Sequence, residues 1–190
     1  MVSNEVNRAI SEWTTWASNP AVQRYDIALL KIWIQFERFV GELFVTYATG
    51  NPSEKGYFPK LMIKFQDEIQ FNVFMRDGTK KYIEYLDKID KLYKHIFKIN
   101  PFDIMLSDTN IKPSLDQMRA IRNYIVHESG EAKTKLINTC FSGNEKKFVE
   151  PNVYLKSREK STKDSYYTYY VKIIETILVS LINDPTTMTP

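Results

Sequence analysis

Apolar and polar positions follow a helical period over most of the chain. The clearest amphipathic stretches span roughly residues 4–17, 20–48, 79–97, 114–128 and 162–183. In the second stretch, apolar residues occupy so much of the helix circumference that we expect this helix to lie centrally in the fold. Its apolar stripe comprises Leu29, Trp33, Phe36, Val40, Leu43, Phe44 and Tyr47, widened by Leu30, Ile32 and Phe39.

Residues that favour helix ends mark the predicted boundaries. Asn19 before Pro20 predicts the start of the long helix, with proline at the first helical position. Thr79 is suited to cap the helix that follows.

The helix over residues 114–128 has predicted boundaries of its own. Ser114 and Gln117 have the spacing of a capping box, in which each side chain bonds to a backbone N–H of the first turn. Gly130 suits the left-handed position after the helix end. These residues predict a helix that closes just before Gly130.

Two segments lack a clear period. Short apolar runs within residues 58–77 fit either strands or helical turns, and residues 141–160 form a basic stretch typical of a surface loop, with room for one hairpin. The sequence therefore predicts an all-α fold in a single domain over residues 1–190. We expect a bundle of four or five helices, with a loop or small β insertion in each of these two segments.

Composition narrows the classes of protein to consider. The chain has 190 residues, 43% of them hydrophobic, only six glycines and a net charge of +3, which suits a globular helical protein and permits a nucleic-acid partner without requiring one. Cys140 is the only cysteine, which excludes an internal disulfide and a zinc site built on several thiolates. Charged residues interrupt the most apolar run, so we expect no transmembrane span, no secretion signal and no membrane partner, and a cytoplasmic protein.

An arginine and a histidine lie five residues apart near the end of the helix over 114–128. Arg122 lies on the apolar face between Met118 and Ile125, and His127 lies about 140° further round in the last turn. One interpretation is structural, because a histidine at a helix C-terminus interacts favourably with the helix dipole and so stabilises the helix. The other is that the two side chains form part of a phosphodiester-cleaving site.

The stretch RNYIVH resembles the motif of the HEPN superfamily, in which arginine, a polar residue that is often asparagine, and three mostly apolar residues precede a histidine. Here these positions are Arg122, Asn123, residues 124–126 and His127. A long central helix, a further long helix, a loop before the motif helix and a closing amphipathic helix are also similar to that family. The resemblance implies a metal-independent endoribonuclease without cofactor, commonly a toxin or antiviral defence factor.

The resemblance also implies partners. Many members pair with a nucleotidyltransferase-type antitoxin, and in a subset that partner modifies a tyrosine two residues after the histidine. Ser129 occupies that position here, so we equally expect an inhibitor protein that binds the cleft or blocks dimerisation.

Cleavage of RNA through its own 2′-hydroxyl needs a base, an acid and positive charge on the phosphorane. Histidine titrates near neutrality and arginine can hold phosphate oxygens, but one copy supplies only one nearby histidine, since His95 fits a surface or packing role. We therefore expect a homodimer in which two copies of Arg122 and His127 share one cleft and Asn123 orients the catalytic groups or the phosphate. RNA is the expected substrate, and no metal ligand is predicted.

Weaker candidates lie elsewhere in the chain. Glu37 is placed to pair with a buried Arg122, or equally with a neighbouring lysine at the edge of the apolar stripe. Lysines and an arginine in the basic stretch are candidates for contacts with the RNA backbone, and the tyrosines of YYTYYVK for base stacking, although core packing explains most of the tyrosines better. The basic candidates are Lys146, Lys147, Lys156 and Arg158.

Two other functions remain open from the sequence. The first is a HEPN-like domain that only dimerises or binds a partner, with its arginine and histidine retained for structure. The second is a helical DNA-binding regulator, although the chain lacks helix-turn-helix spacing with exposed polar recognition residues.

Overall fold

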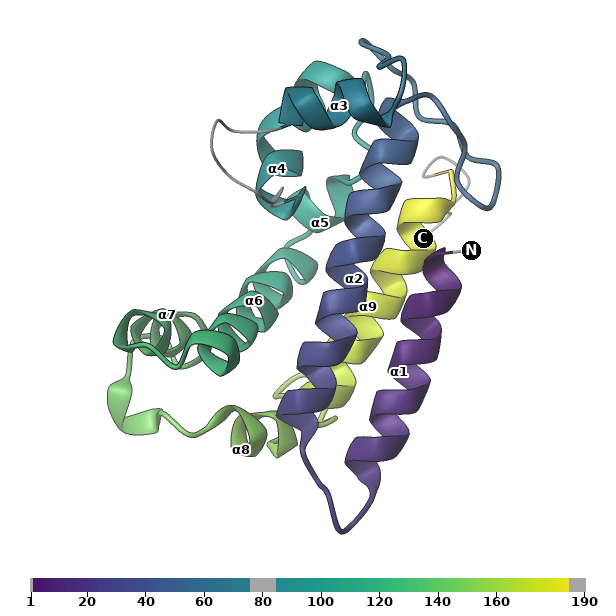
Figure 1. Cartoon of the computed structure of the whole chain (residues 1–190). Coiled ribbons are helices and arrows are strands. Elements are labelled where there is room, and N and C mark those ends of the chain that lie inside the picture. The colour runs from purple at the N-terminus through teal and green to yellow at the C-terminus, as the bar shows by residue number, and fades with distance from the viewer. Residues whose placement is uncertain (1, 76–84, 185–190) are drawn as a thin grey trace. The chain divides into compact units, whose positions relative to one another are not determined.

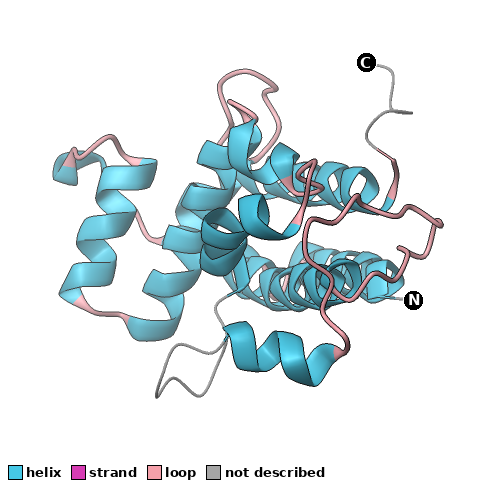
Figure 2. Cartoon of the chain, turned by 90° about the horizontal axis from the view of Figure 1, so that it is seen from above, coloured by secondary structure: helices cyan, strands magenta, loops and turns pink. Residues whose placement is uncertain are grey.

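A computed structural model describes residues 2–75 and 85–184, and these residues form helices joined by loops (Figures 1 and 2). No strand occurs among them, so the predicted all-α class is confirmed. The described part of the chain contains more helices than the four or five expected. They are α1 Val2–Ser18, α2 Tyr25–Ala48, α3 Glu68–Met75, α4 Tyr85–Ile96, α5 Asp103–Ser107, α6 Ile111–His127, α7 Gly130–Cys140, the short 3-10 helix η1 Glu145–Lys147, α8 Pro151–Lys156 and α9 Tyr166–Ile182.

The described residues fall into two compact units, each built from separate stretches of the chain. Among the described residues, unit 1 draws on 2–3, 36–75, 85–108 and 176–184, and unit 2 on 4–35 and 109–175. The helices α2 and α9 each contribute one part to unit 1 and the other part to unit 2.

Aromatic side chains form the core of unit 1. Phe44 of α2 packs against Phe71 of α3 and against Phe97 and Phe102, with ring centroids 5.2 to 5.9 Å apart. All four rings are almost completely buried, and edge-to-face packing of this kind adds to the stabilisation from burial. The Tyr47 hydroxyl donates to the carbonyl of Leu181 at 2.5 Å, which ties α2 to α9 within this unit.

Unit 2 combines the first part of α2 with α1, α6, α7, α8 and the first part of α9. Helices α6 and α7 lie side by side (Figure 1). A hydrogen bond of 2.7 Å joins Thr14 of α1 to the hydroxyl of Tyr167 of α9. The predicted stripe on α2 is confirmed across both units, because Leu30 alone among its ten residues is only half-buried.

The long helix starts later than predicted. The Asn19 side chain accepts a hydrogen bond from the Ala21 N–H at 2.9 Å, and the Asn19 carbonyl accepts from Val22 and Gln23. Gln23 then adopts a left-handed backbone with φ of 46°, which no α-helix can continue through. Residues 19–23 therefore make a separate turn, and α2 begins at Tyr25.

Both segments without a clear period contain helix rather than a β insertion. Residues 68–75 form α3, while Leu61 makes an isolated bridge to Phe97. Within 141–160, the chain forms η1 and α8 in place of the hairpin. Pro151 is the first residue of α8, a position at which the missing N–H of proline costs no helical hydrogen bond. The predicted helix from 79 begins in the described residues at Tyr85, and Thr79 lies outside them.

No helix in residues 2–75 and 85–184 combines the length and apolarity needed to cross a bilayer.

Candidate functional site

The motif residues lie on the last turns of α6, the helix that anchors this part of unit 2. Its first three turns are packed into the core, and the side chains of Met118 and Ile121 are completely buried. Arg122, Asn123, Tyr124 and the residue after them are half-buried, and the helix then becomes exposed. The motif thus begins where the core ends.

The predicted capping box is wrong. The residue at the N-cap is Asn110, which makes no side-chain cap, and Ser114 lies one turn inside the helix. The Ser114 hydroxyl donates to the Asn110 carbonyl at 2.8 Å and lies 3.2 Å from the hydroxyl of Tyr169. Gln117 instead accepts a hydrogen bond from Tyr170 at 2.8 Å, so both side chains serve the packing of α9 against α6.

Arg122 and Asn123 are brought into direct contact. The Arg122 Nη1 donates to the Asn123 Oδ1 at 2.8 Å. This bond fixes one side of the guanidinium, and the Nε atom on its inner side is buried. The role of Asn123 in orienting a catalytic group stays a prediction.

His127 is the last residue of α6 and its side chain is exposed. Five residues of helix separate its Cα from that of Arg122 by a rise of about 7.5 Å and a rotation of about 140°. The imidazole of His127 therefore points in a different direction from the guanidinium of Arg122. A substrate that contacts both groups must span this end of the helix.

The turn after His127 differs from the predicted one. Glu128, with φ of 45°, takes the left-handed position, and its N–H donates to the Tyr124 carbonyl at 2.9 Å. Gly130 is the first residue of α7 rather than the residue that ends α6. Ser129 caps α7, because its hydroxyl accepts a hydrogen bond from the Ala132 N–H at 3.2 Å.

Helix α7 and the segment before α8 place further groups beside the motif, and sequence analysis did not identify them. The Tyr124 ring packs edge-on against Phe148 at 5.9 Å, and the Lys133 ammonium lies 4.6 Å from the Phe148 ring centroid. Burial, and then the nearby carboxylate of Glu150, raise the pKa of the Tyr124 hydroxyl. The signal for α7 in the sequence was the pair of apolar residues Leu136 and Ile137, which are buried in the structure.

The weaker candidates are dispersed. Lys146 and Lys147 are exposed on η1 beside Glu145, and Arg158 is exposed after α8. The Lys156 ammonium donates to the Gln23 side chain at 3.2 Å, so it already has a partner within unit 2.

Glu37 is half-buried on the part of α2 that belongs to unit 1, whereas Arg122 belongs to unit 2. The pairing of these two side chains stays a prediction.

The tyrosines of YYTYYVK pack inside unit 2. Tyr167 and Tyr170 are buried, and the Tyr166 ring stacks on that of Tyr154 at 4.3 Å. The Tyr170 hydroxyl, 3.1 Å from that of Tyr154, joins a buried polar network, and burial raises its pKa well above the ordinary value. These contacts support the packing interpretation over base stacking. The same environment raises the pKa of the Cys140 thiol to about 12.

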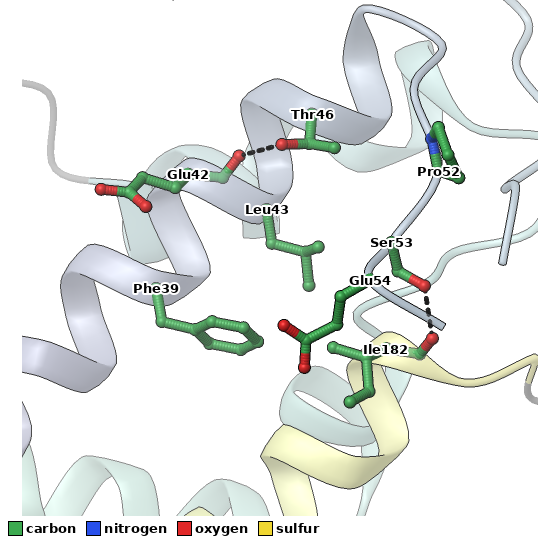
Figure 3. A pocket seen from close by; sticks show the side chains of 8 residues that line it. All are labelled: Phe39, Glu42, Leu43, Thr46, Pro52, Ser53, Glu54 and Ile182. Carbon is green, nitrogen blue, oxygen red and sulfur yellow. Dashed lines mark hydrogen bonds between the residues drawn. The ribbon is translucent and has the colours of Figure 1, made fainter. Parts of the chain in front are cut away.

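A small pocket in unit 1 contains none of the motif residues (Figure 3). The Ser53 hydroxyl donates to the Ile182 carbonyl at 2.6 Å across it, and Ser3 bonds the carboxylate of Glu54. Ser53 thereby holds the loop after α2 against α9, and Glu54 holds the same loop against α1. The lining residues are Phe39, Glu42, Leu43, Thr46, Pro52, Ser53, Glu54 and Ile182.

Within the described ranges, no group of three or more His, Cys, Asp and Glu side chains is close enough to hold a metal ion. Comparisons with protein-family models, with curated proteins and with solved structures give no match to this chain.

Proposed function

We propose that this protein is a metal-independent endoribonuclease of the HEPN type, acting as a homodimer in a toxin or antiviral defence role. The contact between the Arg122 guanidinium and the Asn123 amide, on the same helix end as the exposed His127, is the observation that supports this proposal. It gives each copy one oriented cation and one accessible imidazole.

The chemistry requires two proton transfers. The base takes the proton of the 2′-hydroxyl, whose oxygen attacks the adjacent phosphorus, and the acid gives a proton to the departing 5′-oxygen. His127 serves as base in one copy and as acid in the other. Arg122 stabilises the negative charge that develops on the phosphorane oxygens, with Asn123 holding the guanidinium in place.

The second copy is needed because each copy carries one imidazole at this helix end. His95, the other histidine of the chain, lies in unit 1 in the last turn of α4 and is exposed there. Two-fold pairing of the α6 ends supplies the two imidazoles and two guanidiniums that the reaction uses.

The proposal is tested by incubating the purified protein with total RNA and with tRNA. We expect cleavage that EDTA does not inhibit and products that end in 2′,3′-cyclic phosphate or 3′-phosphate. His127→Ala and Arg122→Ala should each abolish cleavage. The matched controls are His95→Ala and Arg8→Ala, because His95 is exposed and the side chain of Arg8 is 73% exposed. Wild-type cleavage rates in the two motif variants would refute the proposal.

The contact between Arg122 and Asn123 is equally compatible with a second function, a module that only dimerises or binds a partner. In that case the guanidinium serves the helix end, and Arg122→Ala lowers stability without any RNA cleavage to lose. A wild-type protein that dimerises but leaves both RNA substrates intact, under conditions in which it is folded, would favour this alternative.

The proposal also includes how the activity of the nuclease is controlled. Ser129 is engaged in capping α7, where the tyrosine-modified relatives would carry their target. A protein inhibitor that covers the exposed end of α6, or that prevents two copies from meeting, therefore fits this chain better than modification at residue 129. Such an inhibitor should block dimerisation or RNA access in a purified mixture.

A further inference from the structure

Two segments of unit 1 form a surface strip that combines exposed apolar side chains with lysines. The segments are residues 57–64 and 94–99, named here the basic apolar strip. The Lys98 N–H donates to the Lys60 carbonyl at 2.7 Å, and the Met62 N–H donates to the Ile96 carbonyl at 2.8 Å. These bonds and the antiparallel bridge between Leu61 and Phe97 hold the two segments side by side.

The apolar side chains of the strip differ in their burial. Ile96 and Phe97 are buried and anchor the strip to the core of unit 1. Four others expose about half of their surface or more: Phe58 at 59%, Ile63 at 52%, Ile99 at 51% and Met62 at 49%. Side chains this exposed are open to contact with a partner at the surface of unit 1.

The charged side chains of the strip are lysines, and the strip also contains one histidine, His95. Its four lysines, Lys60, Lys64, Lys94 and Lys98, are exposed, and no aspartate or glutamate occurs in either segment. Contact between this strip and its counterpart on a second copy, related by a two-fold axis, would bring like charges together, which disfavours self-association here. The positive charge of the strip therefore favours an anionic partner.

We propose that the basic apolar strip binds the surface of an anionic lipid bilayer. Lysines near such a surface are attracted to acidic headgroups, and their long side chains allow the ammonium groups to stay in water. Phenylalanine, methionine and isoleucine enter the boundary between headgroups and acyl chains. Nucleic acid is a poorer partner, because Met62, Ile63 and Ile99 have no ring on which a base can stack.

This inference is independent of the proposed nuclease, since the strip lies in unit 1 and contains no motif residue. It differs from the sequence-based expectation of no membrane partner, which rested on the lack of a spanning helix. Contact with one leaflet needs no span. Each lysine near an anionic surface contributes about 1 kcal/mol, or about fivefold in binding.

The test is cosedimentation of the full chain with phosphatidylcholine vesicles, with or without about a third of phosphatidylserine, at low and high salt. We expect binding only to the vesicles with phosphatidylserine, weakened by salt. Lys60→Gln combined with Lys98→Gln should weaken it about 25-fold, and Phe58→Ser with Ile63→Ser should also reduce it. Matched controls are Lys135→Gln with Lys160→Gln, whose side chains are exposed elsewhere, and Val179→Ser, 50% exposed on α9.

Three results would overturn the proposal. The first is no binding to either vesicle, and the second is equal binding to both. The third is a lysine variant that binds vesicles as the wild type does but has lost binding to RNA or to an acidic protein, which would make the strip a site for that partner. The lysine pair keeps the proposal testable if the serine variant does not fold, because exposed lysines are rarely needed for folding.

Discussion

The two halves of α6 differ in what surrounds them. From Ile111 to Ile121, six residues are buried, and the half-buried Gln117 between them is hydrogen-bonded to Tyr170. From Arg122 onward the side chains are half-buried, and Val126 and His127 are exposed. The first half stabilises unit 2, whereas the second half offers polar groups to solvent on a rigid support. A helix end fixed by a packed core is a suitable carrier for catalytic side chains.

The largest difference in stability between the two halves of α6 is expected when an aliphatic side chain in each half is shortened to alanine. Met118→Ala should lower the free energy of unfolding by about 2–5 kcal/mol, because Met118 is completely buried and its loss leaves a cavity. Val126→Ala should change it by less than about 0.5 kcal/mol, since Val126 is 49% exposed. Urea unfolding at the same low protein concentration measures both. Similar losses in the two variants would mean that the end of α6 is also packed.

A smaller difference is expected for removal of a tyrosine hydroxyl. Tyr170→Phe should cost about 1–2 kcal/mol, because the Gln117 side-chain oxygen loses the donor that lies 2.8 Å away in a partly buried site. Tyr124→Phe is the matched control, since its hydroxyl is 3.4 Å from the Glu150 carboxylate at an exposed position. Thermal unfolding of both variants gives the comparison, and a loss confined to Tyr124→Phe would contradict it.

The smallest change in stability is expected when cysteine replaces Val126 near the end of α6. For this variant, the reactivity of the thiol is more informative than the stability of the protein. Burial raises the pKa of the Cys140 thiol to about 12, so at pH 8 a disulfide reagent should modify it at least about tenfold more slowly than an ordinary cysteine. In Val126→Cys, the new thiol should react at the ordinary rate. Fast labelling of Cys140 in the folded wild type would show that its surroundings are open.

The same variant can sharpen the dimer proposal. The labelling rate of Val126→Cys should fall as protein concentration rises, because the α6 ends of two copies then cover each other. An unchanged rate across concentrations at which the protein is dimeric would place this helix end outside the dimer contact.

Long amphipathic elements could be predicted from the sequence because each repeats its pattern several times. The stripe on α2 and the end of α6 at His127 are examples. Helix α7 was missed because Gly130–Cys140 is mostly polar and carries just two buried apolar residues. Ser114 was misjudged because α6 begins three residues earlier, at Ile111, so its hydroxyl bonds the Asn110 carbonyl inside the helix and contacts Tyr169 of α9.

The candidate site was predictable in part for a similar reason. Spacing alone placed Arg122, Asn123 and His127 on one helix, whereas the hydrogen bond from Arg122 to Asn123 depends on side-chain conformations that no spacing specifies. The neighbours Phe148 and Lys133 could not be predicted, because they come from elements whose order in space depends on the missed helix.

The division of α9 between the two units has a consequence for synthesis of the protein. Residues 166–175 belong to unit 2 and the rest of this helix to unit 1, so the nascent chain can complete neither core before α9 has left the ribosome. Both cores therefore depend on one and the same helix.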